Sequence, residues 1–549
     1  MKKKSSVFSL GSLLLILFLL ITGCSAETST DYGSNTKKDG TKSGKEEVQQ
    51  GGTLVLGTTA SPTLFNPLYS TDTSSSMIEG FIYSGLVTID REFNPVPDLA
   101  EKWENSDDGL TWTFQLRKGV KWHDGKDFTA DDVVFTYSIP LSKDYKGPRG
   151  LSFETITKVE KVDDYTVKIT LKEPYAPFLA FVGTSGILPK HILGDVPIQD
   201  LGKHEFNTKN PIGTGPFKFE EWKDGEYIKL AANDDYFLGK PKLDGIIDKI
   251  VPDSNALMAQ MQTGEISLTS IAPEQMESAK KLEEQGKVKI LSGPSNSWEY
   301  LGYNLRNPLF KDRNVRIALT HAIDKESIVK AILNGDGTVA HGPGSPANWA
   351  FNENMPKFEY DVNKAKELLK EAGWEKGSDG ILQKDGKKFE FTIKTTSANE
   401  TRQKIAQVVQ EQFKQIGIKA NIQLLEWSAY VKETSPPNWN FDAIVAGWSI
   451  GSDPDPTWFW DTNEIEKGLN YQAYSNQKVD ELVRENTRIV DQQERLKIMH
   501  EVDQIVAEDQ PATFLYYPNG HMIINPKLHG PIYNTANTYF EIEKWYFEK

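Results

Sequence analysis

Residues Gly447 to Gly451 read Gly-Trp-Ser-Ile-Gly, the Gly-x-Ser-x-Gly string that holds a nucleophilic serine in many hydrolases. An apolar stretch precedes the string and histidines follow it downstream, as such an enzyme would need. The chain then continues through Pro454 and Pro456, which obstruct the helix that must directly follow the serine. A surface serine hydrolase using Ser449 is therefore an alternative only, and we expect no enzyme.

The same stretch has the side chains of a binding site. Asp453 and Asp455 follow shortly after Trp448, and Trp458 comes next. Ligands of parallel α/β sheets bind beyond the carboxyl ends of the strands, and acids beside aromatic rings can hold a cationic group between them. A solvated Asp-Pro turn would also account for either acid.

Other kinds of chemistry have little support in the sequence. The eight histidines are scattered without an HExxH motif, and no phosphate-binding GxxxxGK[ST] is present. The formal net charge of −15 argues against partners that attract basic patches, such as nucleic acid or an anionic membrane surface. We therefore expect no cofactor, no metal and no nucleic acid.

The one cysteine, Cys24, stands directly after an apolar segment that ends at Ile21. Three lysines begin the chain, and the apolar segment is shorter than the ~20 residues of a membrane-spanning helix. Residues 1–23 are typical of a signal peptide, and Ile-Thr-Gly-Cys resembles the bacterial lipobox, in which the cysteine is lipidated. A chance cysteine after an ordinary signal peptide is the alternative.

Residues 24–50 are polar and have no apolar period, which predicts a flexible tether. The remainder is long enough for two or three lobes. Strict alternation of apolar residues predicts half-buried strands over 111–117 and 164–171, in a β-rich lobe.

The second half of the chain has a different spacing of apolar residues. Strand patterns at 389–394, 418–424 and 441–448 enclose a helical pattern, which predicts a βαβ unit with a parallel sheet. Helices are also predicted over 361–372 and 315–333.

Several long strings then show a family resemblance. They include "PVPDLAEKWENSDDGLTWTFQLRKGVKWHDGKDFTADDVVFTY", "PIGTGPFKFEEW", "FKDRNVRIALTHAIDKESIVKAIL", "GWSIGSDPDP" and "YYPNG". In order and over 51–549, they resemble the family 5 extracellular solute-binding proteins, the receptor subunits of peptide and nickel ABC importers. Within that family the chain is most similar to the oligopeptide-binding proteins.

The resemblance implies an α/β fold of the periplasmic-binding-protein type II, with two α/β lobes and an inserted β-rich domain around a hinged cleft. The implied boundaries are a discontinuous first domain at 51–77, 206–296 and 511–549, a second domain at 78–205, and a third at 297–510.

The resemblance also implies a lipid-anchored, monomeric receptor on the extracytoplasmic face of a bacterial membrane, which delivers oligopeptides to ABC permease subunits. A nickel or metallophore receptor of the same family is the alternative. An extended peptide would lie between two segments and beside Trp458; the segments are Thr63, Leu64 and Phe65, and Gly447, Trp448 and Ser449.

In many relatives an Asp three residues after the Trp holds the peptide amine. Gly451 occupies that position here, so the anchor falls to Asp453 or Asp455, and we favour Asp453.

Overall fold

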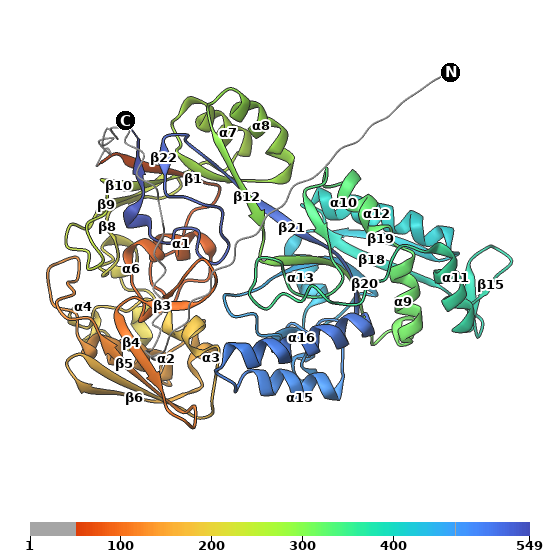
Figure 1. Ribbon diagram of the computed structural model, residues 1–549, viewed down its shortest axis with the longest axis horizontal. Helices are drawn as coiled ribbons and strands as arrows, with labels where there is room; N and C mark the ends of the chain where they lie inside the picture. Colours follow the sequence, from red (N-terminus) through yellow and green to blue (C-terminus); the bar gives the residue numbers. More distant parts are fainter. Residues whose placement is uncertain (1–50, 467, 549) are drawn as a thin grey trace, which may run out of the picture. The chain divides into compact units, whose positions relative to one another are not determined.

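The computed structural model describes residues 51–466 and 468–548, so the expectations for the signal peptide, Cys24 and the tether lie outside the described residues. Its largest sheet has 12 strands, with β12 (Lys289–Pro294) and β14 (Gly337–Val339) attached to β21 (Figure 1). The main path runs in the order β19 (Lys419–Leu425), β18 (Glu390–Thr396), β20 (Ala443–Ser449), β13 (Ser297–Tyr303), β21 (Ala512–Ile524), β11 (Leu268–Ile271), β1 (Thr53–Thr58), β10 (Gly245–Ile250), β9 (Tyr227–Ala232) and β8 (Phe217–Lys223).

The predicted βαβ unit is confirmed. β18 pairs in parallel with both β19 and β20, and α12 (Glu400–Gln415) connects β18 to β19. Ala443 and Val445 of β20 belong to one hydrophobic cluster, whereas Ile444 and Ala446 belong to another. Both faces of β20 are therefore buried from Ala443 to Ala446, which explains the unbroken apolar sequence of this part of the strand.

Helices cover this part of the sheet and contribute apolar residues to the two clusters (Figure 1). The first cluster receives apolar residues from α9 (Arg313–His321), α11 (Val362–Glu371) and α12, and the second from α15 (Gln477–Asn486) and α16 (Gln492–Asp509). The single helix expected over 315–333 is wrong, because α9 ends at His321 and α10 (Lys325–Ala331) begins separately. Asp324 caps α10 by accepting the Ser327 N–H at 2.9 Å. Aspartate is a preferred N-cap residue, so its position favours the start of a new helix.

A second sheet, of four antiparallel strands, contains the alternating stretches. Its order is β4 (Ala100–Asn105), β5 (Thr111–Leu116), β7 (Thr166–Leu171) and β6 (Ile156–Asp163). Trp112, Phe114, Val167 and Ile169 are buried in one large cluster, so the predicted apolar face of these strands is confirmed.

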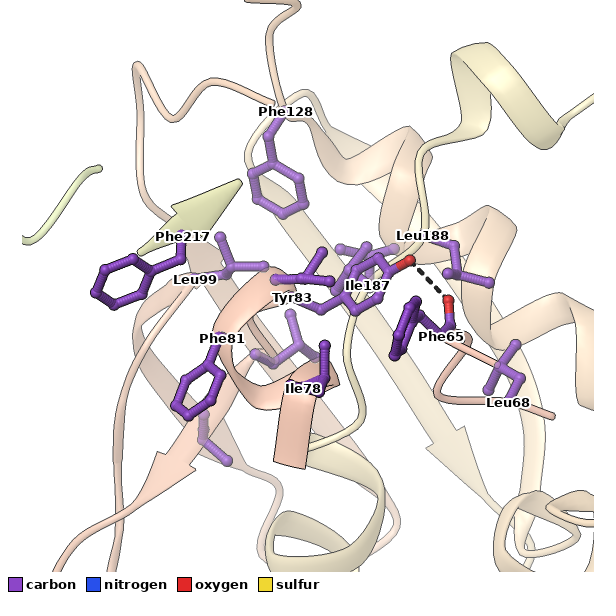
Figure 2. Packing of buried hydrophobic residues seen from close by; sticks show 14 of the residues in the cluster. Phe65, Leu68, Ile78, Phe81, Tyr83, Leu99, Phe128, Ile187, Leu188 and Phe217 are labelled. Atoms are coloured by element: carbon purple, nitrogen blue, oxygen red, sulfur yellow. Dashed lines mark hydrogen bonds between the residues drawn. The ribbon is translucent and has the colours of Figure 1, made fainter. Parts of the chain in front are cut away.

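The same cluster surrounds α1 (Thr73–Ile82) and part of the loop after β1 (Figure 2). Figure 2 shows Phe65 among the buried side chains, with the Tyr83 O–H donating to the Phe65 carbonyl at 3.0 Å. The loop that leads from β1 to α1 is thus fixed near its middle by the core.

β21 connects the two ends of the large sheet. Residues 519–524 pair with β12 and 521–524 with β11, whereas residues 512–518 pair with β13 and β14. Within the described residues no helix is long and apolar enough to span a bilayer.

Candidate functional site

The carboxyl-terminal part of β20 has one unpaired edge. β13 pairs with β20 along its whole length, from Ala443 to Ser449. β18 on the other side pairs only with Ala443 and Ile444. The residues that follow Ile444 therefore lack a neighbouring strand on that side.

Hydrogen bonds at the two ends of β20 show which backbone groups face this open edge. The Asp442 carbonyl accepts the Asn304 N–H at 2.9 Å, and the Ile450 N–H donates to the Asn296 carbonyl at 2.8 Å, both on the β13 side. Backbone groups alternate in direction along a strand, so Gly447 and Ser449 direct theirs to the open edge.

The carbonyl of Val445, one step earlier on this edge, accepts the Thr395 hydroxyl at 3.0 Å. The accessible part of the edge is thus short. It offers the N–H and the carbonyl of Gly447 and of Ser449, which can bond two residues of an added strand.

An ion pair lies beside Gly447. Arg402, in the first turn of α12, donates from Nε and Nη2 to the two Glu299 oxygens at 2.8 and 2.7 Å. Glu299 is the cross-strand partner of Gly447, and a Cβ at Gly447 would overlap its carboxylate. Neither charged residue was expected from the sequence, because they are 103 positions apart and no local pattern relates them.

The segment Thr63–Phe65 offers only carbonyls. The N–H groups of Thr63 and Leu64 donate to Ser75 Oγ at 3.0 and 3.3 Å, and no hydrogen bond to their carbonyls occurs within the described residues. Phe65 differs from expectation: its side chain is in the core, its N–H bonds Asn207 and its carbonyl bonds Tyr83. It has no free backbone group for a ligand.

The aromatic residues near the edge are partly exposed. Trp448 is half-buried, with its ring 5.3 Å from those of Phe459 and Tyr471. The Trp458 side chain and Ser449 are exposed. These rings can contact a ligand held at the edge.

The carboxylate of Asp453 is already occupied. Arg495 of α16 donates to its two oxygens at 2.5 and 2.6 Å, both side chains are buried, and the guanidinium lies over the Trp349 ring at 5.7 Å. In a bidentate pair of this kind, the arginine engages both carboxylate oxygens. The favoured amine anchor of the sequence analysis is therefore engaged elsewhere.

Asp455 is less occupied. Its Oδ1 accepts the N–H and the hydroxyl of Thr457 at 3.0 and 2.6 Å, while Oδ2 makes no hydrogen bond within the described residues. Burial, followed by the charge of Asp453, raises the pKa of Asp455 to about 6. A cationic group would stabilise its ionised form.

The geometry gives no support to a hydrolase at Ser449. Of the three downstream histidines, His521 lies between Ser292 (Nδ1, 2.7 Å) and Asp336 (Nε2, 2.5 Å), and His529 contacts Glu548. Nε2 of His500 is buried without a partner in the described chain. No hydrogen bond joins a histidine to Ser449, and the next helix, α14, begins only at Thr457.

The described part of the chain contains no group of three or more His, Cys, Asp or Glu residues able to hold a metal ion.

Comparison with known proteins identifies the family of this chain. The family model "Bacterial extracellular solute-binding proteins, family 5 Middle" matches residues 94–468. The chain is 48% identical to the oligopeptide-binding protein AppA of Bacillus subtilis over 100% of both sequences. It is 32% identical to the dipeptide-binding protein of Escherichia coli K12, covering 85% of this chain and 89% of the relative.

Solved structures agree. AppA from Bacillus subtilis in complex with a nonapeptide superposes with a TM-score of 0.75 at 50% identity, covering 92% of this chain and 100% of that one. NikZ from Campylobacter jejuni in complex with Ni(L-His) gives 0.75 at 32%, covering 90% and 99%.

These matches confirm the mixed α/β fold of the family and a solute-binding protein rather than an enzyme. The chain belongs to family 5 of the bacterial extracellular solute-binding proteins.

Proposed function

We propose that this protein is the receptor of an oligopeptide ABC importer, and that the peptide main chain adds as a strand at the open edge of β20. One observation carries the proposal: Gly447 and Ser449 have no neighbouring strand on one side, and the N–H and carbonyl of each are directed to that open edge. Relatives named for binding oligopeptides and dipeptides support it.

Main-chain recognition suits a receptor for peptides of varied sequence. Every peptide has the same backbone donors and acceptors, so β-edge addition supplies affinity without reading side chains. The free carbonyls of Thr63 and Leu64 would contribute acceptors for ligand N–H groups.

Asp455 is the proposed anchor of the peptide amine. Its Oδ2 accepts no hydrogen bond within the described residues, Asp455 follows the edge by six residues, and a buried carboxylate that forms no ion pair is costly. Asp453 has the supporting role of pairing Arg495 next to it.

The remaining features follow from the sequence. Lipidation at Cys24 would anchor the receptor to the extracytoplasmic face of the cell membrane, with residues 24–50 as a tether to its permease. We propose three domains: 51–77, 206–296 and 511–549; 78–205; and 297–510.

Native mass spectrometry of residues 25–549, purified without added ligand, tests the proposal. We expect a ladder of retained masses that fit short peptides, which synthetic peptides then displace in calorimetric titration. A metal-containing mass, or binding of Ni²⁺ with histidine in place of peptides, would instead support the metallophore receptor.

A further inference from the structure

A large chamber lies beside α1. It has a volume of about 510 Å³, enough for a long side chain. Its walls come from α1, from residues 83–88 and 96–98, and from 236–238 and 537–544. Leu238 in its wall is 43% exposed, so the chamber reaches the protein surface.

Two buried carboxylates belong to this wall. Glu543 is 8% exposed and Asp98 is 7% exposed. Asp98 accepts the Gly85 N–H at 3.1 Å, whereas the Glu543 carboxylate accepts no hydrogen bond from another residue of the described chain. Neither acid forms an ion pair within residues 51–466 and 468–548.

Arg117 lowers the pKa of Asp98 and Lys544 lowers that of Glu543, but burial outweighs both effects. Arg117 donates its Nε to the carbonyl, not the carboxylate, of Asp98 at 2.6 Å. Lys544 pairs with Glu541 instead. Burial raises the pKa of Asp98 to about 7 and also raises the pKa of Glu543, which disfavours the charged form of each acid. A cationic group would reverse that.

The chamber continues towards the open edge of β20. A second chamber, of about 350 Å³, shares Ser76, Gly80, Tyr83 and Thr184 with the first. Phe181 lines this second chamber, and its ring lies 3.2 Å from an ideal Cβ on Gly451, two residues beyond Ser449. The second chamber therefore reaches close to the segment that follows the edge.

Gly80 stands where the two chambers meet. It lies inside α1, where glycine costs roughly 0.5–1 kcal/mol relative to alanine. Its φ is not positive, and a Cβ built there meets nothing within 4 Å, so neither conformation nor packing requires glycine. The missing side chain leaves the passage open.

We propose that the chamber bounded by Asp98 and Glu543 is a subsite for a basic side chain, lysine or arginine, of a peptide bound at the β20 edge. This rests on the proposed function. The aliphatic stem would pass Gly80 along the apolar wall, and the ammonium or guanidinium would neutralise the two acids.

Calorimetric titration with alanine-rich peptides of one length tests the subsite, with a single lysine moved through each position. Each is compared with its acetyl-lysine counterpart, which keeps the stem and loses the charge. We expect at least one position where lysine binds tenfold more tightly. The double substitution Asp98→Asn with Glu543→Gln should remove that advantage and leave acetyl-lysine peptides unaffected.

Two further variants serve as controls. Gly80→Leu adds no charge and favours the helix, yet it should remove the lysine advantage by closing the passage. Glu101→Gln, at an exposed position of β4, should change nothing. Thermal melting establishes that each variant is folded.

The outcomes separate the two proposals. Equal binding of lysine and acetyl-lysine peptides at every position, or an advantage that survives in both the double variant and Gly80→Leu, overturns the subsite alone. Absence of binding by any peptide overturns the proposed function and the subsite with it. Binding of free spermidine that requires Asp98 and Glu543, with no lysine preference in peptides, assigns the chamber to a small cation and overturns the peptide assignment.

Discussion

At the scale of single residues, the two acids that follow β20 have different surroundings although they are two positions apart. Asp453 is held by Arg495 through two hydrogen bonds, and Asp455 keeps one free oxygen. The sequence pattern identified both as candidates. It favoured Asp453, because Arg495 is 42 positions away from Asp453 and only tertiary packing reveals their pairing.

The pKa of Asp455 predicts a pH dependence of binding. The folded-state pKa of about 6 is above the ordinary Asp value, so this group lowers protein stability as pH rises through that interval. Because a peptide ammonium pairs with the ionised form, affinity should increase as pH rises towards 6 and then level off. The charged and titratable groups near Asp455 are Asp453, Arg495 and Tyr175.

Calorimetry from pH 5 to 7 with a free peptide and its N-acetylated form measures this effect. At pH 7 the free peptide should bind at least tenfold more tightly, about 1.4 kcal/mol. Asp455→Asn should remove both the difference and the pH dependence. An unchanged preference for the free amine in that variant would exclude Asp455 as the anchor.

Asp453→Asn should reduce stability instead. Removing one partner of a buried pair leaves Arg495 uncompensated, which costs about 3–5 kcal/mol. Urea denaturation measures the loss, and Asp455→Asn, which breaks no ion pair, is the matched control. A loss below about 1 kcal/mol would mean that water reaches the Arg495 guanidinium.

At the scale of elements, the spacing of apolar residues predicted strands and helices correctly where a single period, of the strand or of the helix, dominates a segment. Alternation predicted β5 and β7, and the helical period between two apolar strands predicted α12 in its βαβ unit. The break between α9 and α10 was missed, because Asp324 fits the helical period and its capping role depends on local geometry. The open edge depends on how far β18 extends along β20, a tertiary property without a sequence signal.

The open edge predicts a period-two response to changes in the ligand backbone. N-methylation removes one N–H donor, and each lost hydrogen bond costs about 0.5–1.5 kcal/mol. Methylating the ligand residues that face Gly447 and Ser449 should weaken binding several-fold, whereas methylating the residues between them should have little effect unless their N–H groups bond Thr63 or Leu64. A calorimetric scan with no alternation at all would contradict strand addition.

At the scale of the whole molecule, the family and the mixed α/β fold were predicted from long collinear strings, and the comparisons confirm both. The ion pairs around the edge were not predicted. Glu299–Arg402 and Asp453–Arg495 join residues from different elements, and nothing in the local sequence marks such partners.

The proposed lipid anchor predicts where the whole protein is found in the cell. Cys24→Ser removes the only sulfur that could be acylated, so the variant should appear in the medium or as uncleaved precursor. Membrane fractionation and immunoblotting of both forms measure this. Membrane retention of a processed Cys24→Ser protein would show that another part of the chain anchors it.

The shortness of the open edge also bears on the solubility of empty molecules. Unpaired strand edges are where chains associate edge to edge and begin to aggregate. Here the Thr395 hydroxyl donates to the carbonyl of Val445, and the Ile450 N–H donates to the Asn296 carbonyl. Only Gly447 and Ser449 therefore remain available. An edge of that length offers another chain few backbone groups to pair with, so edge-to-edge association at β20 is disfavoured.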